Sequence, residues 1–149
     1  MNEAAGITRL FELPSGLEQL RVEAATDHFR FVDRLIVEWR SGLNRFDKSG
    51  ELILGAFRGA GLVAVGGVNR DPYVDDARVG RLRHLYVRKS DRRSGVGLAL
   101  GRRLLAHAET AFDMVRLRTE TKAAAEFYMR LGFVAVNDET ATHIIRFPR

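Results

Sequence analysis

The sequence predicts a single α/β domain in which a mixed central β-sheet is flanked by helices. The chain has 149 residues, close to the commonest size of one domain, and leaves no room for a second. Its apolar content of 46% and charged content of 29% are those of an ordinary globular protein. Segments with the two-residue period of strands alternate with segments of helical period along the chain, which favours an α/β arrangement.

The first forty residues predict a strand followed by helical structure. Residues 7–13 alternate apolar and polar side chains and end at a Pro-Ser-Gly turn, as an outer strand does. From Leu17 to about Arg40 the apolar residues fall at helical spacing. This stretch predicts one or two helices, with a break near Asp27 and an end at Ser41 and Gly42.

The middle of the chain predicts three strands. Residues 52–57 and 62–68 are short apolar runs separated by a glycine-containing turn, which indicates a hairpin. An aspartate-rich loop follows. Residues 81–87 then alternate before a nearly continuous apolar end, and they form the predicted central strand.

The last third predicts two helices and three strands. Residues 96–110 carry an apolar helical face, and 114–119 alternate as a strand. Residues 121–131 form a second helical face, followed by Gly132 where a C-terminal glycine belongs. Strands at 133–136 and 142–147 complete the order β, α, β, β, β, α, β, α, β, β.

Composition excludes several classes of function. The chain has no cysteine, which removes disulfides, thiolate metal sites and an acyl-cysteine intermediate. No stretch approaches the ~20 apolar residues of a membrane span, and residues 1–10 have no long apolar run, so we expect neither a span nor a signal peptide. We therefore expect a cytoplasmic protein. His107 and His143 lack partners at metal-ligand spacing, and we expect no metal site.

Positive charge is concentrated in one segment. Residues 78–103 carry a charge of +8, whereas the remainder of the chain carries −3. The nine basic residues are Arg78, Arg81, Arg83, Arg88, Lys89, Arg92, Arg93, Arg102 and Arg103. Such a concentration indicates a polyanionic partner, with nucleic acid and a phosphorylated cofactor both open at this point.

The segment from Leu85 to Leu100 joins a strand, a short basic loop, two glycines and a helix. The first turn of a helix leaves about four amides without partners, and these amides bind anionic oxygen. Gly95 and Gly97 remove the Cβ atoms that would hold a diphosphate away from them. Gly101, one turn later, is expected to let the helix lie close to the sheet.

These residues resemble the signature of the GNAT family of N-acetyltransferases, Arg/Gln-x-x-Gly-x-Gly/Ala, here Arg92-x-x-Gly95-x-Gly97 after an apolar strand end. A second match follows at the expected distance. It is Ala124-x-x-Phe127-Tyr128-x-x-Leu131-Gly132-Phe133, which is similar to the family's later helix. The resemblance covers most of the chain, although only residues 85–133 are distinctive.

The resemblance implies an enzyme that moves the acetyl group of acetyl-coenzyme A to an amine by direct attack, without a covalent enzyme intermediate. The main chain of Leu85 and Val87 would pair with the pantetheine arm, and the amides of 93–97 would hold the pyrophosphate. Tyr128 would protonate the departing thiolate. The full set of implied cofactor-binding residues is Leu85, Tyr86, Val87, Lys89, Arg92, Arg93, Ser94, Gly95, Val96, Gly97 and Tyr128.

The chain departs from the family pattern at three positions. Thr121 stands where asparagine is frequent, Arg81 where an acidic residue is frequent, and Lys89 where proline is usual. These changes leave the general base open between Glu120, His84 and a water relay to either. The alternative, non-catalytic interpretation of Tyr128 is a core aromatic residue on an amphipathic helix.

Other functions remain as alternatives. A dinucleotide-binding enzyme would use Glu120 as its ribose acid, but the glycines read G-x-G-x-x-x-G rather than G-x-G-x-x-G. Aromatic residues do not interleave with the basic ones, so we expect no nucleic-acid partner. Because no stretch is apolar enough for a span, we also expect no membrane partner. A non-catalytic coenzyme A sensor of the same fold stays open.

The acceptor amine has no sequence signature. Arg78, Arg81, Arg83 and His84 lie near the central strand and would favour an acceptor with a carboxylate. A homodimer is expected from the habit of the family alone.

Overall fold

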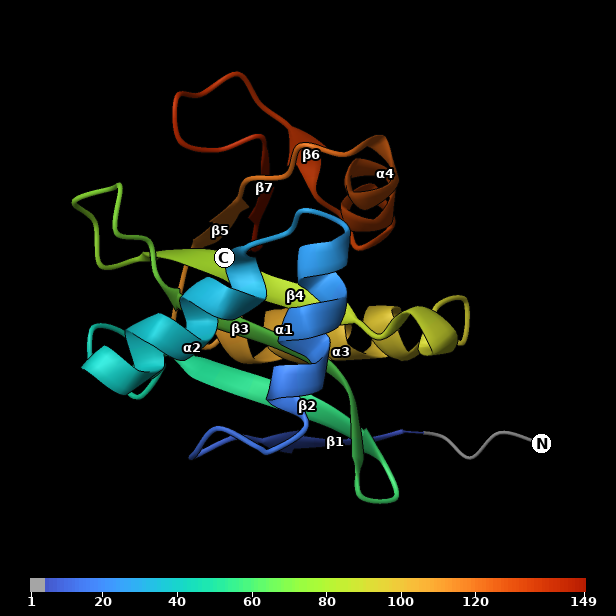
Figure 1. Cartoon of the computed structure of the whole chain (residues 1–149). Coiled ribbons are helices and arrows are strands. Elements are labelled where there is room, and N and C mark those ends of the chain that lie inside the picture. Colours follow the sequence, from blue (N-terminus) through green and yellow to red (C-terminus); the bar gives the residue numbers. More distant parts are fainter. Residues whose placement is uncertain (1–4) are drawn as a thin grey trace.

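In the computed structural model, which describes residues 5–149, seven strands form one mixed sheet (Figure 1). The strands are β1 (Gly6–Arg9), β2 (Leu52–Arg58), β3 (Gly61–Arg70), β4 (Val79–Val87), β5 (Met114–Leu117), β6 (Val134–Ala135) and β7 (His143–Arg146). Their order in the sheet is β1-β2-β3-β4-β5-β7-β6. Only β4 and β5 pair in parallel. The predicted mixed α/β sheet is thus confirmed.

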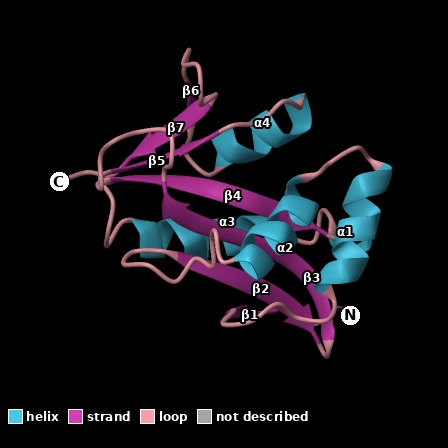
Figure 2. Cartoon of the chain, turned by 60° about the vertical axis from the view of Figure 1, so that its left-hand side comes forward, coloured by secondary structure: helices cyan, strands magenta, loops and turns pink. Residues whose placement is uncertain are grey.

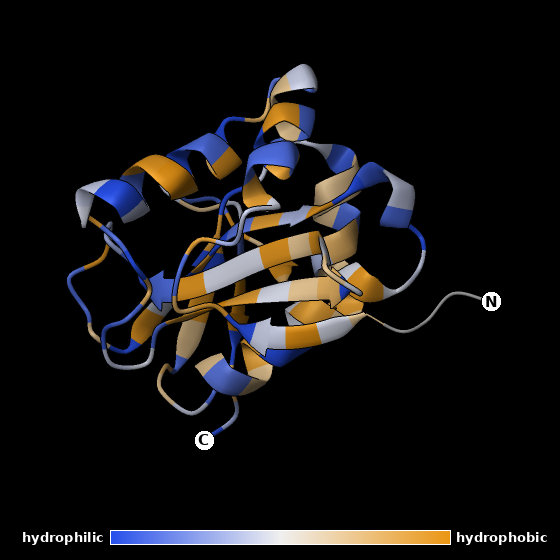
Figure 3. Ribbon diagram, turned by 60° about the horizontal axis from the view of Figure 1, so that its bottom comes forward, coloured by the Kyte–Doolittle hydropathy of each residue, from blue (hydrophilic) through white to orange (hydrophobic). Residues whose placement is uncertain are grey.

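Helices cover both faces of the sheet (Figure 2). They are α1 (Leu17–Thr26), α2 (Phe31–Ser41), α3 (Val96–Ala108) and α4 (Lys122–Arg130). Residues of α1 and α2 share one apolar cluster with the sheet, and residues of α3 and α4 share another on the opposite face. We call these two sides the α2 face and the α3 face. Figure 3 shows that the strands between them are predominantly apolar.

Most predicted boundaries agree with the structure. The helical stretch breaks after Thr26, and Gly42 ends α2 with a φ of 80°, a conformation that glycine adopts without strain. The first strand is shorter than predicted, because β1 pairs with β2 only as far as Arg9 opposite Leu54. Both C-terminal strands are also shorter than predicted. No helix among residues 5–149 is long and apolar enough to cross a membrane.

The sheet is open on one side of β4. Pairing between β4 and β5 covers three positions and ends at Arg81 opposite Arg116. β4 continues to Val87, whereas β5 ends at Leu117 and the chain turns away toward α4. Residues 82–87 therefore have no neighbouring strand on that side, and we call them the open edge of β4.

A buried ion cluster lies where β4 and β5 are paired. Oδ2 of Asp71 is 3.2 Å from Nη1 of Arg81 and 3.1 Å from Nη1 of Arg116. The Asp71 side chain has no exposed surface, and its Oδ1 accepts a hydrogen bond from the Tyr73 amide. Because Arg81 and Arg116 are register partners, this one carboxylate ties the β3–β4 loop to both strands at the closed end of the opening.

Candidate active site

The loop between β4 and α3 is held by Asp91. This residue ends a short 3₁₀ turn (Lys89–Asp91), and its carboxylate lies 2.8 Å from Nε of Arg58 and 2.6 Å from Nε of Arg88. Burial by itself raises the pKa of Asp91, but the hydrogen bonds from Arg88 and Arg58 outweigh it and lower the pKa. Ser94 donates a hydrogen bond to the Asp91 carbonyl. Contacts within the chain therefore fix the conformation of the loop that precedes α3.

The N-terminus of α3 offers unpaired amides. Gly95 has a φ of 86°, and a Cβ added there would meet no atom within 4 Å. The first hydrogen bond of the helix runs from the Ala99 amide to the Gly95 carbonyl. The amides of residues 96–98 therefore point out of the helix end without helical partners, and such amides bind anionic oxygen.

Two further glycines, Gly97 and Gly101, allow side chains to pack closely against α3; the predicted role of Gly97 at the diphosphate stays a prediction. A Cβ on Gly97 would lie 3.1 Å from Cγ2 of Val87 and 3.3 Å from Cε2 of Phe127. A Cβ on Gly101 would lie 2.6 Å from Cδ1 of Leu131, so Gly101 admits Leu131, the residue that caps the end of α4, and not the sheet. Gly95 keeps the space at the helix end open, whereas Gly97 and Gly101 allow close packing of α3.

Much of the basic segment is neutralised internally. The ion pairs are Arg78 with Asp113, Arg81 with Asp71, Arg83 with Glu38, Arg88 with Asp91 and Lys89 with Asp27. Within residues 5–149 the other four, Arg92, Arg93, Arg102 and Arg103, have no ion pair. Within the basic segment 78–103, the positive charges without an ion pair therefore lie in the loop before α3 and on that helix. Lys89 is paired with Asp27, and its predicted contact with the cofactor stays a prediction.

Arg92 contacts the end of the open edge. Its Nε donates a 3.1 Å hydrogen bond to the Val87 carbonyl, and its guanidinium lies 5.4 Å from the centre of the Tyr86 ring. The predicted main-chain site at Leu85 and Val87 thus lies next to an arginine whose charge is not balanced by an ion pair among the described residues. Pairing of a pantetheine arm with these residues stays a prediction.

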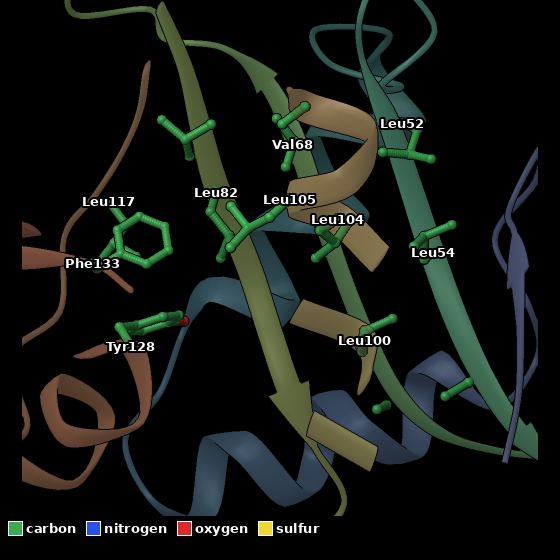
Figure 4. Packing of buried hydrophobic residues seen from close by; sticks show 14 of the residues in the cluster. Leu52, Leu54, Val68, Leu82, Leu100, Leu104, Leu105, Leu117, Tyr128 and Phe133 are labelled. Atoms are coloured by element: carbon green, nitrogen blue, oxygen red, sulfur yellow. The ribbon is translucent and has the colours of Figure 1, made fainter. Parts of the chain in front are cut away.

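Tyr128 lies on α4 and faces the open edge of β4. The ring is 9% exposed and packs edge-on against Phe127 and Phe133, with centroid distances of 5.2 and 5.8 Å. Figure 4 shows its hydroxyl oxygen directed from α4 toward β4. The hydroxyl has no hydrogen-bond partner among residues 5–149, and burial raises its pKa. The ring therefore serves the core, while the hydroxyl is kept protonated at the opening.

His84 sits in a β-bulge of β4. Val65 pairs with Tyr86 and Gly67 with Arg83, so Gly66 alone opposes both His84 and Leu85. His84 has a φ of 61°, which is uncommon for a residue other than glycine. Strained backbone conformations persist only where the surrounding structure enforces them, and they are frequent at functional sites.

The His84 ring lies in an apolar environment on the α2 face. It is 6% exposed, meets Phe46 edge-on at 5.9 Å, and neither ring nitrogen has a hydrogen bond of normal geometry in the described chain. Burial, followed by the charges of Arg83 and Arg34, lowers its pKa to about 3, against a weaker opposing effect of a backbone group of Phe31. Such a ring is neutral near pH 7 and a weak base.

The second candidate base, Glu120, lies beyond the end of β5. Its side chain is 80% exposed and lies 3.7 Å from Nε of Arg118. Thr121, at the position of the family's frequent asparagine, caps α4 by accepting a hydrogen bond from the Ala124 amide. The choice of general base between Glu120, His84 and water stays open.

Glu23 is a residue that sequence reasoning missed. From α1 its carboxylate accepts a 2.5 Å hydrogen bond from the Tyr86 hydroxyl and a 3.1 Å one from the Lys89 amide. Burial, followed by the Glu23 hydrogen bond, raises the pKa of Tyr86. Asp27 adds the ion pair to Lys89. α1 therefore helps to fix the same loop that Asp91 holds.

Comparison with known proteins identifies relatives of this arrangement. A family model described as an acetyltransferase (GNAT) domain matches residues 23–149. No curated protein sequence matches the chain.

Solved structures share the fold over nearly the whole chain. A protein of Exiguobacterium sp. 255-15, assigned provisionally to the acetyltransferases, is 27% identical with a TM-score of 0.86, over 97% of this chain and 94% of that one. Ard1 from Thermoplasma volcanium is 19% identical with a TM-score of 0.72, over 99% and 100%. Glucosamine-6-phosphate N-acetyltransferase from Arabidopsis thaliana is 16% identical with a TM-score of 0.62, over 94% and 98%.

Proposed function

We propose, from the premise that the chain belongs to the GNAT family of acetyltransferases, that it transfers the acetyl group of acetyl-coenzyme A directly to a primary amine of a small molecule or a protein. One observation carries the choice of coenzyme: the open edge of β4 leads straight to the unpaired amides at the N-terminus of α3. An extended arm that ends in a diphosphate matches that pair of features.

The residues present fit this coenzyme. Amides of residues 96–98 would hold the diphosphate, and the open space beside Gly95 would admit it. Arg92 and Arg93 would add free positive charge next to those amides. The open edge of β4 would hydrogen-bond the extended arm as an added strand. When bound, the coenzyme supplies an acetyl group activated as a thioester.

The chemical step would use residues from both sides of the opening. The neutral amine would attack the thioester carbonyl, and a main-chain amide near Val87 would donate a hydrogen bond to the developing oxyanion. Tyr128 would give its hydroxyl proton to the departing sulfur. The low pKa of His84 favours Glu120 or a water over His84 as the group that takes the proton from the amine.

Ligand-induced thermal stabilisation tests the choice of coenzyme. Acetyl-coenzyme A at about 100 times its Kd should stabilise the fold by about 2.7 kcal/mol, which raises Tm by roughly 5–10 °C for a chain of this size. NAD at the same concentration should leave Tm unchanged. Stabilisation by NAD with none from acetyl-coenzyme A would refute the proposal, whereas binding without thiol release toward any amine would indicate the sensor alternative.

Tyr128→Phe tests the proton donor while keeping the ring that the core requires. We expect kcat to fall by about 10²- to 10⁴-fold, the usual range for a general acid, with the acetyl-coenzyme A shift in Tm preserved. An unchanged kcat in a folded variant whose chemical step limits turnover would return Tyr128 to a packing role. Retained stabilisation by the coenzyme serves as the internal control for an intact site.

A further inference from the structure

A polar groove of about 820 Å³ lies on the α2 face of the sheet, outside the residues assigned to the coenzyme. Its walls are α2 with the loop that follows, the end of β3, the β3–β4 loop and Arg83. Volumes of this size are typical of sites for small molecules.

The groove reaches the point where the sheet opens. Asn69 and Arg83 line it, and in the register of the sheet Asn69 pairs with Arg81, the last residue of β4 that also pairs with β5. Arg83 is the second residue of the open edge. A molecule in the groove thus approaches the closed end of the opening, at Arg81, from the face opposite α3.

Two amide side chains in the groove lack the partners that buried polar groups normally have. Asn69 is 7% exposed, and its Oδ1 has no hydrogen bond among residues 5–149. Nδ2 of Asn44 is also buried and, within the same residues, unpaired. Buried polar atoms without partners are rare. As placed, the Asn69 acceptor oxygen is buried. A half-turn of the Asn69 carboxamide exchanges its oxygen and nitrogen at nearly constant shape, so the side chain can present the oxygen to a hydrogen-bond donor of a ligand.

Glu38 supplies a negative charge in the same groove as Asn69, next to Arg83. Its carboxylate is 15% exposed and its ion pair with Arg83 is long, at 3.5 Å. The acids deeper in the groove are fully engaged: Glu51 accepts from the amides of Lys48 and Arg70, and Asp71 belongs to the buried ion cluster. Among the carboxylates of the groove that are not exposed, Glu38 is therefore the one best able to receive a new donor. Asp47 has no ion pair within the described residues, but it is exposed to solvent.

The remaining free charge in the groove is positive. Arg34, Arg45 and Lys48 line it and have no ion pair within the described residues, against two acids without one, Asp47 and the amide-bonded Glu51. The charge of Arg34 also contributes to the lowered pKa of His84. An anionic group on the ligand would find partners along this side.

We propose that this groove is the acceptor site and that its acceptor is a small amine that also carries an anionic group, a carboxylate or a phosphate. The ammonium group donates to Glu38 and Asn69, and the anionic group meets Arg34 and Arg45. This inference rests on the proposed acetyltransferase function and narrows its substrate class. It also replaces Arg78, Arg81 and Arg83, all of which are paired, as the source of carboxylate selectivity.

Matched acceptor pairs test the substrate class. Thiol release from acetyl-coenzyme A is measured with glycine against glycinamide, with glutamate against glutamine, and with an amino sugar phosphate against the free amino sugar. The anionic member of at least one pair should have the higher kcat/KM by about ten- to a hundredfold, the range of one charge-assisted hydrogen bond. The first pair reports on a carboxylate next to the amine, the second on an additional side-chain carboxylate, and the third on a phosphate.

Variants then assign the preference to the groove. Arg34→Gln should raise KM for the preferred anionic amine by about tenfold or more and leave KM unchanged for the paired amine that lacks this anionic group. Glu38→Gln should raise KM for both members of the pair. Arg40→Gln is the matched control, because Arg40 is an exposed arginine of the same helix outside the groove. All variants are compared by the Tm shift that acetyl-coenzyme A induces.

The outcomes separate this inference from the proposed function. If the wild-type protein does not bind acetyl-coenzyme A, both the acceptor proposal and the proposed acetyltransferase function are overturned. With coenzyme binding intact, the acceptor proposal is overturned if the anionic members have no advantage, if no anionic amine is acetylated or raises Tm, or if Arg34→Gln and Arg40→Gln behave alike. A charge preference that Arg34→Gln removes supports it.

Discussion

His84→Asn should remove a defined part of the pH dependence of folding. The ring has a pKa of about 3 in the folded protein, against 6.5 when unperturbed, because it is buried next to Phe46 and near Arg83. Between these two values the unfolded chain binds a proton that the folded chain does not. Stability is therefore fully present above pH 6.5 and is lost as the pH falls toward 3.

The magnitude follows from the two pKa values. From about pH 8 to pH 5 this single group should cost about 2 kcal/mol of folding free energy, since one pKa unit corresponds to about 1.36 kcal/mol. Because pH 5 lies well above the folded pKa, the result depends almost entirely on the unfolded value. Replacement by a residue that does not titrate removes this contribution.

Urea unfolding at the two pH values measures the effect. Asparagine accepts a positive φ better than most residues, so His84→Asn should keep the bulge. Its stability relative to wild type should improve by about 2 kcal/mol on going from pH 8 to pH 5. His28→Asn is the matched control, an exposed histidine with a φ of 65°. A relative change below about 0.5 kcal/mol at His84 would refute the reasoning.

Two further predictions concern the packing around the site. Asp71→Asn should lower the free energy of unfolding by about 3–5 kcal/mol, because two buried guanidinium groups lose their shared carboxylate. The same change at the exposed Asp113, which also has two arginine partners, should lower Tm far less, and equal effects in a thermal scan would contradict the argument. Gly67→Ala should cost about 1–3 kcal/mol in urea unfolding, because its Cβ would lie 2.6 Å from Cε1 of Phe46. Gly6→Ala, with no atom closer than 4.0 Å, should be nearly neutral, and a neutral Gly67→Ala would remove the packing argument.

The order of the elements and the helix-end glycines could be predicted because their signals are local. Apolar periodicity decides helix or strand within about ten residues. Gly95 and Gly132, with φ values of 86° and 106°, occupy turns that their sequence neighbours already indicate. The N-terminus of α3 as a candidate anion site follows from the same local reading.

The pairing of charged residues could not be predicted in this way. Arg78 and Asp113 are 35 positions apart, and Tyr86 and Glu23 are 63 apart, so neither contact has a local signal. As a result the sequence indicated nine basic residues for a polyanionic partner, whereas the folded chain leaves only four of these nine, in the loop before α3 and on α3, without an ion pair among the described residues. The role of Gly101 was missed for the same reason, since Leu131 is distant in sequence.

The open edge of β4 also has a consequence for colloidal behaviour. An unpaired strand edge is a template for another extended chain, and proteins usually protect such edges with charge or a covering segment. Here the unpaired edge is that of a central strand, β4, beyond its short pairing with β5. Arg92, which donates a hydrogen bond to the Val87 carbonyl, places a positive charge at the end of this edge. A ligand that lies along this edge would act as the missing strand. Its depletion would leave the protein more prone to strand-mediated aggregation.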